Sequence, residues 1–155
     1  MPSKELSVAE YRALAEFRYE LRRFLHFSER AARAAGLEPQ QHQLLLALKG
    51  MREGEQATIG ILAEQLQIEH HSVVELVDRM EARGLVRRVR AEDDRRFVLV
   101  ELTARGERQL PLLSLFHRAE LRAITPAISR ALEALGKETQ RARWLARRMS
   151  SHQAT

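Results

Sequence analysis

Cysteine is absent from the 155-residue sequence. The chain therefore forms no disulfide, no thiolate metal site and no sensor that works by thiol oxidation. No apolar run approaches the roughly 18 residues that a transmembrane helix needs, and the first residues, MPSKELSVAEYRAL, lack the apolar centre of a signal peptide. These absences predict a cytoplasmic protein.

Motifs typical of enzymes are also missing. The sequence has no glycine-rich phosphate loop and no HExxH pair of zinc ligands. His70 and His71 are adjacent, so on a helix they point about 100° apart and do not form the same-face pair of an HxxxH metal site. We therefore expect no enzymatic activity, no cofactor and no metal site.

Basic residues are in surplus, with a formal net charge of +5. A composition of 45% hydrophobic and 30% charged residues is typical of a folded chain, and we expect a single unit over residues 1–155. The surplus is uneven, because residues 36–106 hold ten Lys/Arg against twelve Asp/Glu, whereas seven arginines crowd into residues 79–96. A polyanionic partner must therefore be contacted by a local patch.

Helical periodicity begins the chain. Apolar residues at three- and four-residue steps predict one long helix over residues 8–35, which Gly36 ends in the position that a C-terminal glycine prefers. Pro39 then opens a shorter helix, QQHQLLLALKGM, that is expected to stop near Gly54.

The last third of the chain is also predicted to be helical. Thr125-Pro126 resembles an N-cap followed by the first helical residue, and Gly136 resembles a stop. Pro111 is unfavourable inside a helix, so a helix there must kink or begin later than Thr103. We expect three helices, near residues 104–124, 126–135 and 137–149.

The centre of the chain has the layout of a helix-turn-helix. Thr58 is a suitable N-cap for IGILAEQL, and the turn Gln67-Ile68-Glu69 leads into HHSVVELVDRMEARG. Two short helices joined by a tight turn are typical of this DNA-binding motif. The inward positions of the second helix are Val73, Leu76, Val77 and Met80, and the outward ones are His70, His71, Ser72, Glu75 and Arg79.

Two alternatives are open for the start of that second helix. His70, His71 and Ser72 lie where backbone N–H groups favour phosphate, so they are candidates to contact the DNA backbone or bases. The other interpretation is that they are solvated residues at a helix start.

A hairpin follows Gly84. LVRRVR and FVLVELT alternate with the period of a strand, placing Val98, Val100 and Leu102 on one face, and AEDDRR connects them. A hairpin directly after a helix-turn-helix is a wing. An arginine at its tip suits the narrow minor groove, and an acid two residues away can hold that arginine extended. The alternative is an ordinary solvated hairpin charge.

These segments together resemble the multiple antibiotic resistance regulator (MarR) family of bacterial transcription factors. Asp94-Arg95-Arg96, followed by Leu102-Thr103 and Gly106, is similar to the wing signature of that family, Asp-x-Arg with a downstream Leu-Thr-x-x-Gly. VVELVDRMEARGLVRR resembles its recognition helix and exit. The resemblance implies a mainly α fold with a small β-hairpin wing, in which residues 37–103 form a winged helix-turn-helix lobe and residues 8–35 and 104–150 supply dimerisation helices.

The same resemblance implies a homodimeric repressor of transcription that binds a pseudo-palindromic operator in double-stranded DNA. Arg96 would enter the minor groove with Asp94 as its partner. Glu75 departs from the basic or small polar residue common there, and it would repel phosphate or accept from a cytosine amino group. The expected wing contacts are Arg88, Arg90, Asp94, Arg95 and Arg96.

An effector is implied as well, because members of the family commonly bind small, often phenolic anions in a cleft between the dimer helices and the DNA-binding lobe. The residues that would border such a cleft are Arg18, Arg22, His26 and His42. Residues of these types are also found as structural or solvated groups. The alternative function is a winged-helix module that binds proteins without DNA, which the net charge of −2 over residues 36–106 favours.

Overall fold

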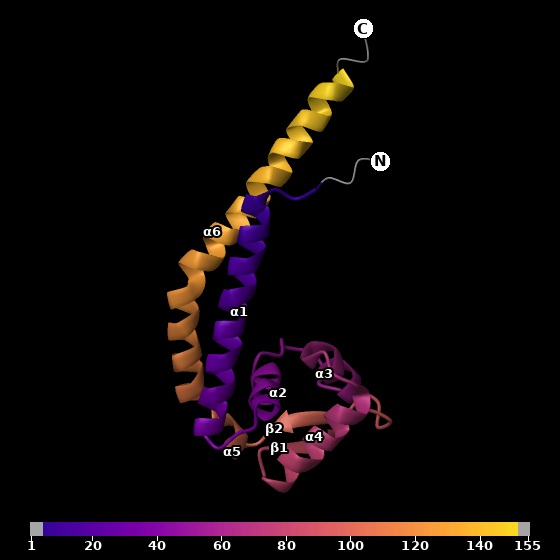
Figure 1. Cartoon of the computed structure of the whole chain (residues 1–155). Helices are drawn as coiled ribbons and strands as arrows, with labels where there is room; N and C mark the ends of the chain where they lie inside the picture. The colour runs from indigo at the N-terminus through magenta and orange to yellow at the C-terminus, as the bar shows by residue number, and fades with distance from the viewer. Residues whose placement is uncertain (1–4, 152–155) are drawn as a thin grey trace. The chain divides into compact units, whose positions relative to one another are not determined.

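The computed structural model describes residues 5–151, and the side chains of residues 5–136. The described chain is mainly helical with one two-stranded antiparallel sheet, which confirms the predicted fold class (Figure 1). It divides into two compact units, one running from Ser28 to His117 and the other combining residues up to Phe27 with those from Arg118 on. The elements are α1 (Val8–Ala34), α2 (Pro39–Lys49), α3 (Ile59–Leu66), α4 (His70–Ala82), β1 (Val86–Arg90), β2 (Val98–Leu102), α5 (Ala104–Glu107) and α6 (Leu110–Ser151).

The first two helices begin where the sequence predicts. α1 ends just before Gly36, whose φ of 78° is in the left-handed region that glycine adopts without strain. Pro39 is the first residue of α2, and the backbone N–H of Glu38 donates to Gln41 Oε1 over 3.1 Å at this end. α2 ends at Lys49, earlier than the predicted stop near Gly54, because the chain already turns at Gly50.

The core of the unit from Ser28 to His117 lies among α2, α3, α4 and the hairpin. The four inward positions predicted on α4 are all buried, and they meet leucines of α2 and α3 and valines of the two strands. Burial of these apolar side chains is the main force that holds the three short helices together. The largest buried apolar residues are Leu37, Leu44, Leu45, Leu62, Val73, Leu76, Val77, Met80, Leu85, Val86 and Val100.

The helix-turn-helix is formed by α3 and α4. Thr58 caps α3 as predicted, since its Oγ1 accepts a hydrogen bond of 3.2 Å from the backbone N–H of Ile61. Gln67 takes a left-handed φ of 53° in the turn that follows, and the N–H of Ile68 donates to Ala63 O over 3.2 Å. This tight turn sets the direction in which α4 leaves α3.

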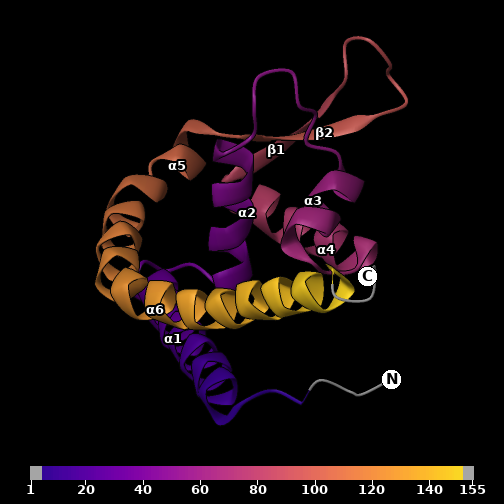
Figure 2. The same cartoon turned by 90° about the horizontal axis from the view of Figure 1, so that it is seen from above.

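The wing is the hairpin of β1 and β2. Val86 pairs with Leu102 and Arg88 with Val100 in an antiparallel register. The N–H of Val100 donates to Ala57 O over 2.9 Å, which attaches β2 to the segment before α3. The loop between the strands protrudes beyond them (Figure 2), and its residues 92–96, here named the wing tip, are exposed apart from the half-buried Asp94.

A close backbone contact holds the wing base, here defined as Gly84, Leu85, Thr103 and Gly106. Thr103 Oγ1 donates to Gly84 O over 2.6 Å and accepts from the N–H of Gly106 over 3.1 Å. A Cβ atom added to Gly106 would lie 2.1 Å from Leu85 O. The spacing Leu-Thr-x-x-Gly therefore has a structural cause, because only glycine lets α5 approach the strand entry so closely.

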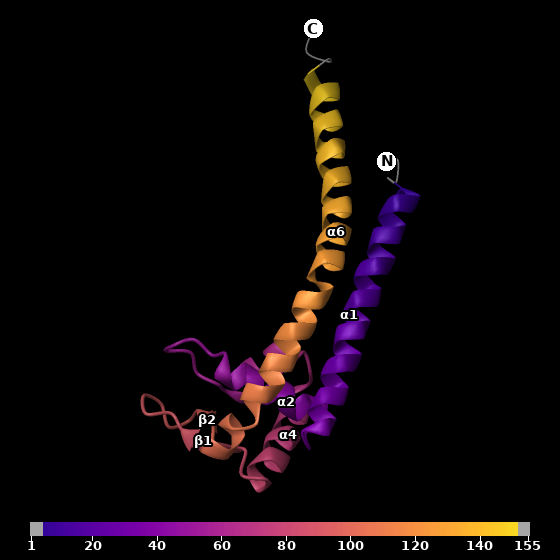
Figure 3. The ribbon, with the colours of Figure 1, turned by 90° about the vertical axis from the view of Figure 1, so that its left-hand side faces the viewer.

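The C-terminal helices differ from the prediction. In place of three helices the structure has a short α5 and then one continuous α6 that passes through Pro126 and Gly136 (Figure 3). Thr125 does not act as an N-cap, since its hydroxyl donates to Leu121 O within the helix over 2.6 Å. Pro111 is the second residue of α6, where the missing N–H breaks no helical bond, so the helix does begin later than Thr103. In the part of the chain that is described, no helix is long and apolar enough to cross a membrane.

Candidate nucleic-acid interface

The outward face of α4 is open to solvent. Of the five positions that the sequence predicts for DNA contact, His70, His71, Glu75 and Arg79 are exposed and Ser72 is half-buried. The N-cap residue Glu69 makes no side-chain capping bond. The first N–H groups of α4 therefore point outward without that cap, which is the arrangement in which a helix N-terminus favours an anion.

At the wing tip, Arg96 forms a fork with Asp94. The guanidinium donates from Nε to Oδ1 over 3.0 Å and from Nη2 to Oδ2 over 2.6 Å, and the backbone N–H of Arg96 donates to Oδ1 over 3.0 Å. The Arg96 side chain is nevertheless 87% exposed. The guanidinium, and then the backbone N–H, lower the pKa of Asp94 below its ordinary value. The predicted pairing of an acid with the tip arginine is thus present before any partner binds.

The other arginines of the wing take different positions. Arg90 donates from Nη1 to the backbone carbonyl of Arg95 over 2.9 Å, so its side chain braces the loop. Arg95 is exposed. Arg87, which was not among the predicted site residues, pairs with Glu101 across the hairpin over 2.9 Å.

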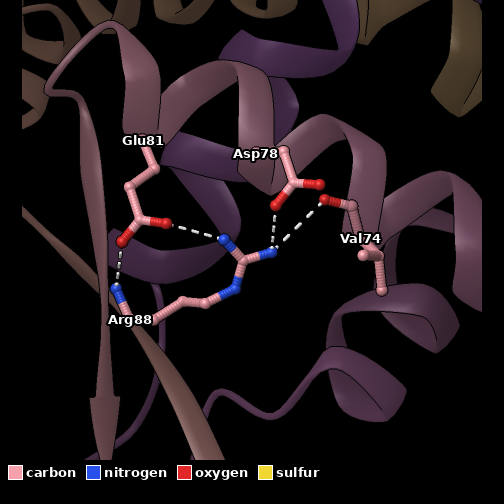
Figure 4. Close-up of polar contacts among 4 residues, drawn as sticks. All are labelled: Val74, Asp78, Glu81 and Arg88. Carbon is pink, nitrogen blue, oxygen red and sulfur yellow. Dashed lines mark hydrogen bonds and ion pairs between the residues drawn. The ribbon is translucent and has the colours of Figure 1, made fainter.

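Arg88 turns away from the wing surface toward α4. Its guanidinium lies between Asp78 and Glu81 at 2.6 Å from each, and its side chain is only 27% exposed (Figure 4). The backbone N–H of Arg88, and then its guanidinium, lower the pKa of Glu81. The sequence predicts no role for these two acids, and its one related signal is that Arg88 follows Val86 by two residues, so both lie on the same face of β1.

The four candidate effector residues fall into both compact units. Arg18, Arg22 and His26 are exposed on α1 at four-residue spacing, in the unit that contains residues up to Phe27. His42 belongs to the other unit, where only 3% of it is exposed. Among residues 5–136 no group of three His, Cys, Asp or Glu side chains is placed to hold a metal ion.

His42 packs against a second histidine inside its unit. Its ring centroid lies 4.8 Å from that of His117, and its Nε2 has no hydrogen-bond partner. His117 is bonded through Nδ1 to Leu113 O over 2.6 Å and through Nε2 to Ser28 Oγ over 2.7 Å. Burial, and then the neighbouring His117, lower the pKa of His42 below 6.5.

Comparison with known proteins agrees with this geometry. The model of the MarR family matches residues 35–96, which run from the end of α1 to the tip arginine Arg96. Residues 35–96 are therefore similar to the MarR family. The curated organic hydroperoxide resistance transcriptional regulator of Bacillus subtilis (strain 168) is 39% identical over 61 residues, which are 39% of this chain and 42% of that protein. The match thus spans less than half of that MarR-type relative.

Solved MarR-type structures share the fold. AbsC, a MarR family transcriptional regulator from Streptomyces coelicolor, is 23% identical with a TM-score of 0.66, over 96% of this chain and 99% of that one. An F27L mutant of MepR from S. aureus, bound to oligodeoxyribonucleotide, is 18% identical with a TM-score of 0.59 over 95% and 99%. CouR from Rhodococcus jostii RHA1, bound to p-coumaroyl-CoA, is 23% identical with a TM-score of 0.61 over 77% and 82%. The MarR family and these neighbours are transcriptional regulators and not enzymes.

Proposed function

We propose that this chain is a sequence-specific DNA-binding regulator of transcription. The observation that carries the proposal is the fork of Asp94 and Arg96, which keeps an arginine both ordered and 87% exposed at the end of a protruding loop. A guanidinium held in this way binds with little loss of side-chain entropy. The oligodeoxyribonucleotide bound to the MepR mutant, which has a similar fold, supports the same use of this lobe.

Each part of the lobe has a proposed task. α4 enters the major groove, with its N-terminal residues His70, His71 and Ser72 near phosphate and Glu75 and Arg79 toward base edges. The wing enters the minor groove through Arg96, and its neighbours add positive charge. Arg90 and Arg95 supply this positive charge, and Asp94 orients the guanidinium of Arg96.

The regulator is proposed to act as a homodimer. Tyr11, Leu14, Leu21 and Leu25 share one face of α1 and are exposed, as are large apolar residues of α6 such as Leu132. A second copy of the chain would remove this apolar surface from water. Two copies of α4 related by a twofold axis fit half-sites about 34 Å apart, which makes a pseudo-palindromic operator the expected target. We propose that the bound dimer represses transcription.

A small molecule, either phenolic or anionic, is proposed to release the repressor. Arg18, Arg22 and His26 place positive or titratable groups along one exposed face of α1, and CouR, which shares the fold, is bound to p-coumaroyl-CoA. The relative from Bacillus subtilis is named for organic hydroperoxide resistance. Because this chain has no cysteine, a thiol cannot be its sensor.

The second candidate is a protein-interaction module that uses the winged helix without DNA. The observation in its favour is the net charge of −2 over residues 36–106, which opposes general attraction to phosphate.

Selection of fragments from genomic DNA with the full chain, followed by a salt series on the recovered fragment, separates the two. A DNA-binding dimer recovers fragments with an inverted repeat, and its affinity falls steeply with salt, with a log–log slope of about −0.9 for each phosphate contact. A protein-interaction module recovers no fragments that share a sequence, and it binds duplex DNA weakly at every salt concentration. Release of the recovered fragment by p-coumaroyl-CoA and simple aryl carboxylates then tests the effector.

A further inference from the structure

Arg88 joins the middle of β1 to α4 through four hydrogen bonds. Nη2 donates to Asp78 Oδ1 and Nη1 to Glu81 Oε2, both over 2.6 Å, and the backbone N–H donates to Glu81 Oε1 over 2.9 Å. A longer contact of 3.5 Å joins Nη2 to Val74 O. Val74, Asp78 and Glu81 follow one another at helical spacing on one side of α4, so a single guanidinium spans two turns of the helix (Figure 4). We name Arg88 with Asp78 and Glu81 the clamp.

The clamp lies where the hydrophobic core of the wing ends, because Arg88 pairs across the hairpin with the buried core residue Val100. Val86 is 1% exposed, whereas Arg90, four residues further along β1, is exposed. Arg88 lies between them on the same strand face. A two-stranded hairpin is marginally stable on its own, so the direction of its outer half depends on such contacts. The planar fork of arginine fixes orientation as well as distance, because two separate carboxylates accept from its two terminal nitrogens.

The clamp also affects the charge of the DNA-facing side of α4. Asp78 follows Glu75 by three residues and is therefore its neighbour on the helix surface. The Asp78 and Glu81 side chains are 61% and 40% exposed. Without Arg88, these two carboxylates would be unpaired beside the residues proposed to contact phosphate. They would then repel the phosphates of the DNA. With Arg88, one positive charge lies between them at hydrogen-bonding distance.

We propose that Arg88 is a positioning residue that holds the wing at a fixed angle to α4, so that Arg96 and the outward face of α4 meet adjacent grooves of one duplex. The inference rests on the proposed function and assigns Arg88 no contact with DNA. A rigid lobe of this kind discriminates between sequences, because both elements must be in register with the grooves at once. Binding to arbitrary DNA requires only charge and is less dependent on the angle.

Arg88→Gln and Arg87→Gln form a matched pair for the test. Both substitutions remove one positive charge from β1, but Arg87 faces solvent and pairs with Glu101 rather than with α4. The probes are the fragment recovered by the native protein and a mixed-sequence duplex of equal length. We expect Arg88→Gln to weaken binding to the recovered fragment about tenfold more than Arg87→Gln does, the loss typical of one misplaced specific contact. On the mixed-sequence duplex the difference between the two variants should be smaller, because only the repulsion from the uncovered Asp78 and Glu81 acts there.

The salt dependence of DNA binding distinguishes a direct phosphate contact by Arg88 from a positioning role. If Arg88→Gln alone reduces the log–log salt slope by about 0.9, Arg88 contacts a phosphate directly and the positioning role is overturned. Equal losses for the two variants on the recovered fragment overturn it as well. Arg88→Lys keeps the charge but not the fork, so we expect it to restore binding to the mixed-sequence duplex and only part of the discrimination. Full restoration by lysine would show that charge alone matters.

A double variant, Asp78→Asn with Glu81→Gln, tests the clamp from α4 while Arg88 stays in place, and it applies even if Arg88→Gln fails to fold. It removes two negative charges, so binding to the mixed-sequence duplex should tighten. The positioning role predicts that preference for the recovered fragment nevertheless falls about tenfold, as for a misplaced contact. If both duplexes are bound more tightly by the same factor, the acids only repel DNA and the inference is wrong. Failure of the native protein to recover any fragment would instead refute the proposed function.

Discussion

The base and the tip of the wing are held in opposite ways. At the wing base, backbone atoms of Gly84 and Leu85 meet Thr103 and Gly106 with no room for another carbon atom. At the wing tip, exposed loop residues are held by side chains, through the fork between Asp94 and Arg96 and the bond from Arg90 to the carbonyl of Arg95. Contacts at the base are lost only if the lobe unfolds, whereas side chains at the tip can be replaced without disturbing the core. Stability should therefore reside at the base and recognition at the tip.

Arg88 belongs to neither class. Its side chain is less exposed than that of Arg96, and its partners lie on α4 instead of the wing. The same residue type thus braces the lobe at one position and faces solvent at another, eight residues further on. Substitutions at the wing base and at the wing tip test whether stability depends on the base and DNA binding on the tip.

The largest effect is expected at the wing base, from Gly106→Ala. The new Cβ would lie 2.1 Å from the carbonyl oxygen of Leu85, which is backbone and cannot turn aside. We expect the free energy of unfolding in urea to fall by about 3 kcal/mol. Gly136→Ala is the control, because no atom lies within 4 Å of its added Cβ, and better helix propensity should stabilise the protein by up to about 1 kcal/mol. Equal stability of Gly106→Ala and the native protein would refute the role of the base.

A smaller effect, on binding alone, is expected at the wing tip. Arg96→Ala should weaken binding to the recovered fragment about tenfold through loss of a minor-groove contact. Its thermal midpoint should match the native one, because the Arg96 side chain is 87% exposed. Arg95→Ala removes the same charge from the adjacent exposed position. If the two alanine variants lose affinity equally, the fork with Asp94 has no special part in recognition.

The smallest effect is expected on stability when the pH is lowered. It should arise from His42 in the core and not from the wing tip. Burial depresses the pKa of His42 below 6.5, so the unfolded chain takes up a proton first as pH falls. The stability contributed by neutral His42 is complete above pH 6.5 and decreases below it, by at most about 1.4 kcal/mol per pH unit for one group. Urea unfolding between pH 7.5 and 5 should reveal this decrease in the native protein. His42→Leu should reduce it, and an unchanged pH dependence in that variant would assign it to another group.

Much of the lobe was accessible from the sequence because its signals are local. The cap at Thr58 reaches Ile61, three residues on, and the buried positions of α4 follow from helical periodicity. The pairing of Asp94 with Arg96 spans two residues. In the C-terminal region the local signals were misleading, because α6 continues through Pro126 and Gly136, residues that elsewhere begin or end helices.

By itself the sequence determined which segments are helical, where the hairpin turns and which charges stand at its tip, since these properties depend on neighbours a few residues away. Only the tertiary structure decided that Arg88 faces Asp78 and Glu81, and that Gly106 lies against Leu85. Such contacts join different elements, and they depend on how α4, the wing and α5 pack around one core. The physical reason is that the direction of a side chain on a strand is set by the face that burial selects, which no spacing within the strand alone can specify.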